Sequence, residues 1–385
     1  MKELKKYFLD RRFLFPAGFL ILFEIFMQSG IYKNFLRPRS YAANVNHIVK
    51  TINKSDLRPN ILILGTSVAY QGINLPYLNS LLKDRGLSVQ SGATEGAMLI
   101  TQHLIFKSII DHNPGIKTVL HFSEISFPWT AKHLLDVSNK SMVSQFPRKQ
   151  SFDLLSQYEY RLTESDYSYL LIKSISYRSD LRDFAFSPLY RIKLLAREKR
   201  LPAKDFPYEN QYEYSMAVIQ AKNLQDCIHN FPFGLPEIDS NNQRITDRMH
   251  KEAMFRTCQL AQHDPMDFPG SPQWKDLYFR RLKVFFNDIE SRGIRVITVF
   301  PPYSQLIKDP RAKIRASVWN QKLDEIRNGK NINYIDLRRS LDGPDNNSLY
   351  YDTIHLNRRG SLRLTERLAE SIKELSAKGD LLPEN

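Results

Sequence analysis

Four consecutive apolar residues, Ile61 to Leu64, are followed at once by Gly65-Thr66-Ser67. A short continuous apolar run of this kind is typical of a strand buried on both faces, as in the interior of a parallel sheet. Open α/β sheets bind ligands beyond the carboxyl ends of their strands, and Ser67 lies just past such an end. The sequence therefore offers Ser67 as a candidate nucleophile, with an ordinary turn serine as the alternative.

Further strand and helix patterns predict a doubly wound α/β fold. Predicted strands cover residues 87–90, 117–122, 294–300 and 333–337, and helical spacing covers residues 76–85, 98–110, 277–292, 317–327 and 362–375. Because short buried strands alternate with helices, we expect a parallel sheet with helices on its faces. The core domain is predicted at residues 60–376, and residues 377–385 form a tail.

The other end of the chain carries a base and a carboxylate. Asp352 and His355 are three residues apart, and Asn357 and Gly360 follow before the last helical pattern. A serine needs a base to take its proton, and a carboxylate beside a histidine fixes the tautomer of the imidazole. A sheet can bring the ends of a chain together, so we expect Ser67, His355 and Asp352 to form a catalytic triad.

Together, the two segments resemble the SGNH (GDSL-type) hydrolase superfamily. Gly65-Thr66-Ser67 stands where that superfamily has Gly-x-Ser after its first strand, and residues 352–360 match its Asp-x-x-His-Leu-Asn-x-x-Gly motif before the last helix. The matched parts are residues 58–126 and 275–375. The resemblance implies a three-layer, flavodoxin-like fold with a parallel sheet, a serine esterase or O-acyltransferase activity, and no cofactor.

The resemblance also implies how the oxyanion is held. Backbone N–H groups of Ser67 and of a glycine in the second block are the expected donors; Gly96 is the better match, and Gly92 is the second. The asparagine that adds a side-chain donor in the family is missing, because residues 123–126 read Ser-Glu-Ile-Ser. Loss of one oxyanion donor costs about 10²–10³ in rate. The sequence therefore leaves three possibilities: a substitute donor such as Glu124 or Ser126, a different chemistry, or an inactive protein.

The N-terminal segment predicts attachment to a membrane. Residues 13–27 read FLFPAGFLILFEIFM, and basic residues precede them. A spanning helix needs roughly 20 mostly apolar residues, which residues 13–32 supply with Glu24 and Gln28 as exceptions. Since basic residues favour the cytoplasmic side, we expect residues 1–36 to form a signal anchor with a transmembrane helix. The bulk of the chain then lies on the periplasmic or outer face. A cleaved signal peptide and a buried helix are the alternatives.

Two further segments lie outside the matched parts. Residues 37–59 are predicted to be a polar linker, and residues 127–272 are predicted to be a mainly helical insert, for example at residues 189–195. The insert is rich in tyrosine, phenylalanine, lysine and arginine. A long insert beyond the strand ends is well placed to act as a lid or substrate platform. The alternative is a helical cap with core aromatic residues and solvated charges.

The composition limits the classes of partner. The net charge is +14 with a pI near 9.5, which suits an anionic membrane surface, an acidic polymer or nucleic acid. Motifs typical of nucleic-acid binding are missing, and this disfavours nucleic acid as a partner. Cys227 and Cys258 can pair only if the fold brings them together. With His229 and His263 they match no zinc spacing, so we expect no metal site.

These observations lead to the hypothesis of a membrane-anchored serine esterase or O-acyltransferase that acts on a cell-envelope glycan or polymer. The layout resembles that of D-alanine transfer proteins of teichoic-acid assembly and of alginate O-acetylation proteins. This resemblance implies an acyl ester or envelope polymer as substrate and a membrane acyl-donor protein as partner. The alternative is a catalytically inactive envelope protein of the same fold that binds a glycan or a membrane partner.

Overall fold

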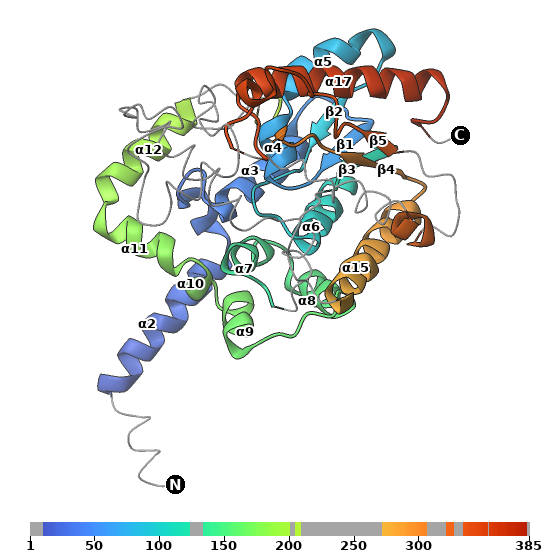
Figure 1. The fold of residues 1–385 in the computed structure, drawn as a ribbon. Coiled ribbons are helices and arrows are strands. Elements are labelled where there is room, and N and C mark those ends of the chain that lie inside the picture. The colour runs from blue at the N-terminus through green and yellow to red at the C-terminus, as the bar shows by residue number, and fades with distance from the viewer. Residues whose placement is uncertain are drawn as a thin grey trace, which may run out of the picture. The chain divides into compact units, whose positions relative to one another are not determined.

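The computed structural model of the chain describes residues 11–123, 134–200, 205–208, 272–305, 321–326, 334–352 and 354–382. The chain divides into two compact units. Unit 1 comprises residues 1–47 and 134–203, and unit 2 comprises residues 48–133 and 204–385. The described part of the predicted insert therefore belongs largely to the same unit as the N-terminal segment, while the sheet belongs to unit 2 (Figure 1).

Unit 2 contains a five-stranded sheet with the order β2-β1-β3-β4-β5. Its strands are β1 (Ile61–Leu64), β2 (Val89–Ser91), β3 (Thr118–Phe122), β4 (Arg295–Phe300) and β5 (Tyr334–Asp336). All neighbouring strands are parallel; Ile61 of β1 lies opposite Val89 of β2 and Thr118 of β3. This order is one of the common arrangements of doubly wound proteins. The predicted α/β class and parallel sheet are confirmed.

Helices of unit 2 lie on both faces of this sheet (Figure 1). One side carries α4 (Ser67–Gly72), α5 (Leu75–Leu82) and α17 (Arg358–Ala377), and the other carries α6 (Leu99–Ile110) and α15 (Pro272–Glu290). Short 3-10 turns are η2 (Lys83–Arg85) and η5 (Asn346–Leu349). Helix α17 buries Leu364, Leu368 and Ile372. Their spacing of four residues places them in one apolar stripe, which packs the helix onto the unit.

The predicted polar linker at residues 37–59 contains a helix, α3 (Tyr41–Lys54). Val45, Ile48 and Ile52 of this helix are buried. Spacings of three and four residues form an apolar stripe on a helix, but the polar residues between them dominate the local composition. The linker interpretation missed the helix because it considered composition rather than periodicity.

Unit 1 is built from helices in its described residues. They are α2 (Arg11–Gln28), η1 (Ile31–Phe35), α7 (Val137–Val143), α8 (Arg148–Gln157), α9 (Glu164–Leu171), α10 (Lys173–Ser176), α11 (Arg178–Phe186) and α12 (Pro188–Arg200), with the first part of α3. The helical character predicted for the insert is confirmed for residues 134–200. The cysteines and histidines considered for a disulfide or a metal site lie outside the described residues; they are Cys227, His229, Cys258 and His263.

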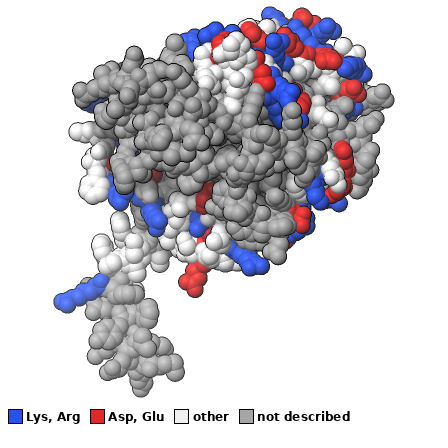
Figure 2. Space-filling view, in the orientation of Figure 1, with Lys and Arg blue, Asp and Glu red and all other residues white. Residues whose placement is uncertain are grey.

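The apolar N-terminal segment forms α2, which extends from unit 1 (Figure 1). Its exposed large apolar side chains are Leu14, Phe15, Phe19, Leu20, Ile21, Leu22, Ile25 and Phe26. In Figure 2 the atoms of this extension that are not grey are mainly white, with a blue side chain near its end. Within the part of the chain that the structure describes, none of the helices combines the length and the apolar character needed to cross a membrane.

Toward its C-terminal end, α2 packs against other helices of unit 1. Met27 is buried. The Glu24 carboxylate accepts hydrogen bonds from the backbone N–H groups of Lys173 (2.6 Å) and Ser174 (3.0 Å). The carboxylate that interrupts the apolar run in the sequence thus caps the first turn of α10, where helix N–H groups lack partners within the helix.

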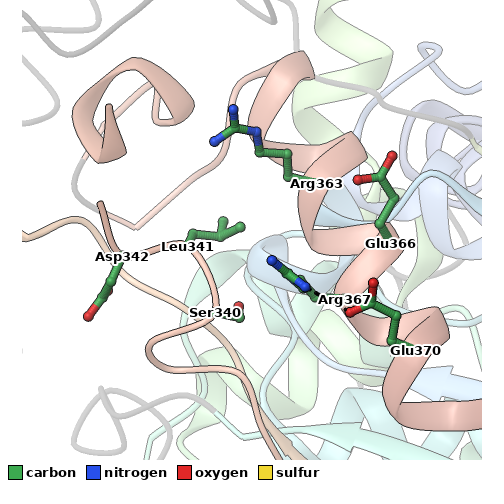
Figure 3. A pocket seen from close by; sticks show the side chains of 7 residues that line it. All are labelled: Ser340, Leu341, Asp342, Arg363, Glu366, Arg367 and Glu370. Atoms are coloured by element: carbon green, nitrogen blue, oxygen red, sulfur yellow. Dashed lines mark hydrogen bonds and ion pairs between the residues drawn. The ribbon is translucent and has the colours of Figure 1, made fainter. Parts of the chain in front are cut away.

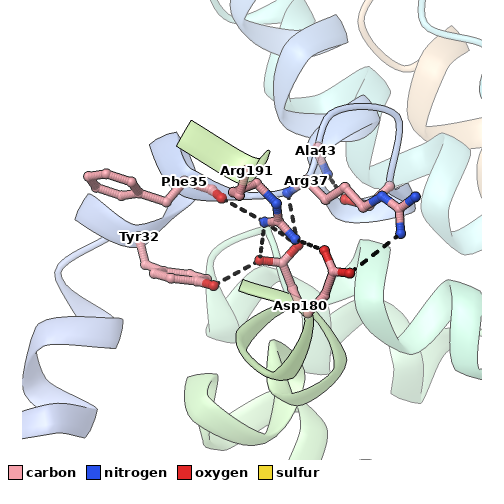
Figure 4. Close-up of polar contacts among 8 residues, drawn as sticks. Tyr32, Phe35, Arg37, Ala43, Asp180 and Arg191 are labelled. Carbon is pink, nitrogen blue, oxygen red and sulfur yellow. Dashed lines mark hydrogen bonds and ion pairs between the residues drawn. The ribbon is translucent and has the colours of Figure 1, made fainter. Parts of the chain in front are cut away.

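A buried ion-pair network fixes the segment after α2 to helices α11 and α12 (Figure 4). The Arg191 side chain is 1% exposed and donates to both carboxylate oxygens of Asp180 (3.0 and 3.1 Å) and to the Phe35 carbonyl (2.9 Å). Asp180 also accepts from the Tyr32 hydroxyl and from the backbone N–H of Arg37, both at 2.8 Å. The buried guanidinium therefore has carboxylate and carbonyl acceptors that compensate for its removal from water.

Replacing Asp180 by alanine removes one of the two carboxylates that pair with a buried guanidinium, because Arg191 also donates to Asp183. Breaking a buried ion pair from one side typically costs about 3–5 kcal/mol, so we expect Asp180→Ala to lower the free energy of unfolding by about 3 kcal/mol, measured by urea denaturation. The exposed pair Arg37–Asp183 (3.9 Å, side chains 58% and 42% exposed) provides the control. Arg37→Gln is expected to change stability by less than about 1 kcal/mol. Equal effects of the two substitutions contradict the prediction.

The core of unit 2 holds a neutral histidine. His121 on β3 is 1% exposed and lies edge-on to the rings of Phe285 and Phe286. Burial lowers the pKa of His121 to about 3. This position makes His121 a packing residue of the core.

The His121 pKa makes stability depend on pH. An unfolded histidine has a pKa near 6.5. Below pH 6.5 the unfolded chain therefore binds a proton that the folded chain does not, and the free energy of unfolding decreases as the pH is lowered. We expect His121 to account for a loss of about 2 kcal/mol between pH 7 and pH 5. Urea denaturation of His121→Gln is expected to show a loss smaller by that amount, whereas the exposed His112→Gln keeps the wild-type loss. An unchanged loss in His121→Gln contradicts this account.

Candidate active site

Ser67 is the first residue of a short helix, α4, that begins directly beyond β1. The first backbone bond of this helix runs from the N–H of Tyr70 to the carbonyl of Thr66 (3.0 Å). A Cβ on Gly65 would lie 2.9 Å from the Phe122 Cβ and 3.0 Å from the Ala69 Cβ. The turn therefore needs glycine for close packing. The result is a serine at a helix N-terminus, where backbone N–H groups lack partners within the helix.

Asp352 forms three hydrogen bonds, two of them with His355. One carboxylate oxygen, Oδ1, accepts the backbone N–H groups of Ile354 (3.0 Å) and His355 (2.8 Å). The other, Oδ2, lies 2.7 Å from His355 Nδ1. The Asp352 side chain is 1% exposed and that of His355 is 12% exposed. Because the carboxylate accepts a hydrogen bond from Nδ1–H, the Nε2 atom is left as a proton acceptor.

The remaining motif residues shape the loop that carries this pair. Leu356 forms an antiparallel bridge with Tyr350. The Asn357 side chain accepts the backbone N–H of Gly360 (3.0 Å) and so caps α17. A Cβ on Gly360 would lie 2.1 Å from the carbonyl oxygen of Leu349, so only glycine fits. The motif thus specifies a tight loop as well as a chemical group.

The three predicted triad side chains meet in unit 2. His355 Nε2 lies 2.8 Å from Ser67 Oγ, on the opposite side of the imidazole from Asp352. A hydroxyl, an imidazole and a buried carboxylate in this order can pass a proton from the hydroxyl to Nε2 and stabilise the resulting imidazolium. The arrangement is chemically able to generate a serine nucleophile.

The two glycines considered as oxyanion donors differ in position. The Gly92 N–H donates to the Ile63 carbonyl (2.9 Å), and a Cβ on Gly92 would lie 2.8 Å from Ile105 Cγ2. Gly92 is therefore a packing glycine whose N–H is already used. Gly96 lies in a turn closed by the N–H of Ala97 and the Thr94 carbonyl, with φ +65°. Gly92 is therefore excluded as an oxyanion donor, and the role that the resemblance implies for Gly96 stays a prediction.

Hydrogen bonds hold this turn beside α4. The N–H of Thr94 donates to the Gly65 carbonyl (3.3 Å), and the Gln71 side chain donates to Glu95. These contacts tie the loop after β2 to the start and the end of α4. The proposed donors Ser67 and Gly96 thus belong to connected segments.

The block after β3, where the family's asparagine is missing, begins with a buried serine. Ser123 is 1% exposed and its Oγ lies 3.1 Å from His121 Nδ1. Glu124 and Ser126, the possible substitute donors, lie outside the described residues.

Sequence reasoning missed an aromatic contact between α4 and a distant segment. The Tyr70 ring on α4 lies 4.4 Å, between centroids, from the ring of Tyr208. The Tyr208 hydroxyl is hydrogen-bonded to Ser91 Oγ of β2, and burial raises the Tyr208 pKa. A segment that is distant in sequence therefore packs against α4. No periodicity in residues 205–208 signals this contact.

A separate hollow of about 280 Å³ lies along α17 (Figure 3). Its lining residues are Ser340, Leu341, Asp342, Arg363, Glu366, Arg367 and Glu370. None belongs to the triad, and Arg363 and Arg367 pair with Asp345 (3.0 Å) and Glu370 (2.9 Å). We assign no function to this hollow because both of its arginines already pair with carboxylates. Within the described ranges, no three His, Cys, Asp or Glu side chains gather as metal ligands.

Comparison with known proteins adds no assignment to this geometry. The chain matches no family model and no curated protein sequence.

Proposed function

We propose that the protein is a serine esterase or O-acyltransferase with Ser67 as nucleophile, His355 as general base and Asp352 as the residue that orients His355. The observation that carries the proposal is the 2.8 Å contact between His355 Nε2 and Ser67 Oγ, with Asp352 on the other imidazole nitrogen. The resemblance of both motifs to SGNH hydrolases supports the same assignment.

The mechanism proceeds in two half-reactions. His355 Nε2 takes the Ser67 proton while Oγ attacks the ester carbonyl carbon, and the N–H groups of Ser67 and Gly96 stabilise the oxyanion. The imidazolium then protonates the departing alcohol oxygen, which leaves an acyl-serine. In the second half-reaction, His355 deprotonates water or an acceptor hydroxyl, which attacks the acyl carbon and restores the Ser67 hydroxyl.

The substrate class follows from the resemblance and from the N-terminal segment. We propose an acyl ester or envelope polymer as substrate and a membrane acyl-donor protein as partner. Attachment through the apolar surface of α2 is part of this proposal, since that surface exposes Phe15, Phe19 and Leu22, at 82%, 63% and 68%. Passage of the chain across the membrane, and the location of its bulk on the periplasmic or outer face, stay predictions.

A second candidate is a binding protein of the same fold without activity. It is favoured by one observation, the absence of the asparagine donor from residues 123–126. In this case the protein binds an envelope glycan or a membrane partner, and Ser67 is only a turn residue.

Labelling separates the two candidates. A fluorophosphonate probe is expected to react with Ser67, because a base in contact with Oγ makes it nucleophilic. Ser67→Ala is expected to abolish labelling and to remove hydrolysis of a short-chain aryl ester such as p-nitrophenyl acetate. Ser80→Ala, at an exposed serine on α5, is the control and keeps both. Wild-type protein that neither reacts with the probe nor hydrolyses the ester supports the binding protein instead.

Asp352→Asn tests the orienting role. An amide cannot hold the Nδ1–H tautomer as a carboxylate does, and the equivalent change in a serine protease triad lowers kcat by about 10⁴. We expect aryl-ester kcat to fall by about 10²–10⁴ while KM changes little. Asp345→Asn, at a 42% exposed carboxylate that pairs with arginines of α17, is the control and leaves kcat unchanged. Full activity in Asp352→Asn contradicts the proposed triad.

A further inference from the structure

We propose that three cationic side chains at the base of α2 bind the phosphate headgroup of an anionic membrane lipid. This basic cluster consists of Lys33, Arg148 and Lys173, all in unit 1. The inference rests on the proposed attachment of α2 to a membrane and not on the acyl-transfer chemistry.

The three cations converge on neighbouring backbone carbonyls. Lys33 Nζ donates to the Gln145 carbonyl (2.9 Å), Lys173 Nζ donates to the Ser144 carbonyl, and Arg148 donates to the Leu171 carbonyl (2.6 Å). Ser144 and Gln145 are consecutive residues, so the two ammonium groups lie close together. The carbonyls are neutral, and they leave the positive charge of the cluster in place.

Little negative charge offsets the cluster. None of the three cations forms an ion pair with a carboxylate among the residues that the structure describes. Glu24 is the nearby acid, and its oxygens accept the backbone N–H groups of Lys173 and Ser174. Burial lowers the pKa of Lys33. Burial together with the charges of Lys33 and Arg148 lowers the pKa of Lys173 to about 8, and the opposing effect of the Glu24 charge is smaller. An anion placed among these groups is therefore favoured electrostatically.

The surroundings of the cluster select an amphiphile rather than a soluble anion. The Leu171 carbonyl that binds Arg148 also accepts the side-chain N–H of Gln28 on α2 (2.9 Å). Leu171 and Ile172 beside Lys173 are 42% and 39% exposed, and Ile25 on α2 is 59% exposed. A lipid has an anionic head for the cations and apolar chains for these side chains. Free phosphate and nucleic acid have no group that matches the apolar surface.

A purely structural role for the lysines is the competing explanation. The Ser144 and Gln145 carbonyls lie at the C-terminal end of α7, where a cation interacts favourably with the helix dipole. One cation is enough for that role, whereas the cluster brings three together and partly desolvates two. The two roles differ in what they require. Headgroup binding needs both positive charge and an anionic bilayer, whereas the structural role needs no lipid.

Vesicle flotation of the full-length protein tests the inference. Wild-type protein is expected to bind vesicles of phosphatidylcholine and phosphatidylglycerol more tightly than vesicles of phosphatidylcholine alone. Each lysine near an anionic surface contributes about fivefold to binding, so Lys33→Gln/Lys173→Gln is expected to weaken binding to the mixed vesicles about 30-fold. Its binding to neutral vesicles is expected to stay at the wild-type level. Lys33→Arg/Lys173→Arg, which keeps the charge, is expected to retain the preference for anionic vesicles.

Two controls make the result specific. Lys373→Gln/Lys378→Gln removes the same charge from the C-terminal end of α17 and its C-cap, where both lysines pair with carboxylates, and is expected to bind like wild type. Fluorophosphonate labelling of Ser67 and urea denaturation verify that each variant is folded. Inorganic phosphate at matched ionic strength is expected not to release the protein, which separates a lipid headgroup from free phosphate.

Three results overturn the inference. Equal binding of wild type and the glutamine variant to the mixed vesicles contradicts the headgroup site but is compatible with membrane attachment through α2. A loss in the α17 control as large as in the cluster variant reduces the effect to net charge. Failure of wild type to bind either vesicle refutes membrane attachment and the headgroup site with it, whereas Ser67 labelling reports on the proposed chemistry independently.

Discussion

The Asp352 carboxylate has two separate tasks, one for each oxygen. Oδ1 is held by the backbone N–H groups of Ile354 and His355, and this fixes the carboxylate relative to its own loop. Oδ2 is then free to hold the His355 imidazole. A buried charge is costly unless hydrogen-bonded, and here the same bonds that satisfy the charge determine where Nε2 points. The position of the candidate base thus depends on a loop of only a few residues.

The contact between base and nucleophile depends on a second constraint, the packing of α4 against α17. A Cβ on Gly72 of α4 would lie 3.3 Å from Leu364 of α17. The backbone N–H of Asn74, just beyond α4, donates to Thr365 Oγ1 of α17 (3.0 Å). These contacts bring the helix that begins at Ser67 next to the helix that follows His355. The distance from Ser67 to His355 is therefore set by the same packing that closes this side of the sheet.

Local patterns predicted the sheet, and the two terminal motifs predicted which side chains approach one another. The apolar run at residues 61–64 is fully buried, and β2 to β5 begin and end within two residues of the predicted strands. The helix α4 was not foreseen, because six residues are too few to show helical periodicity. The Tyr70–Tyr208 contact was not foreseen either, because a tertiary contact between distant segments has no local signal. The division into units was also not predicted, because no local pattern in the sequence indicates that the described insert forms one compact unit with the N-terminal segment.

Net charge illustrates why composition alone could not locate a binding surface. Arg191 and Lys173 contribute equally to the formal charge of +14. Arg191 is buried between two aspartates and the Phe35 carbonyl, so its charge is used within unit 1. Lys173 donates to a neutral carbonyl and lies close enough to Lys33 and Arg148 for their charges to lower its pKa. The first cation stabilises the fold, whereas the second belongs to a group of three cations with Glu24 as the nearby acid at the C-terminal end of an apolar helix. Only the partners of each cation, which the fold determines, distinguish a structural charge from one that can attract a ligand.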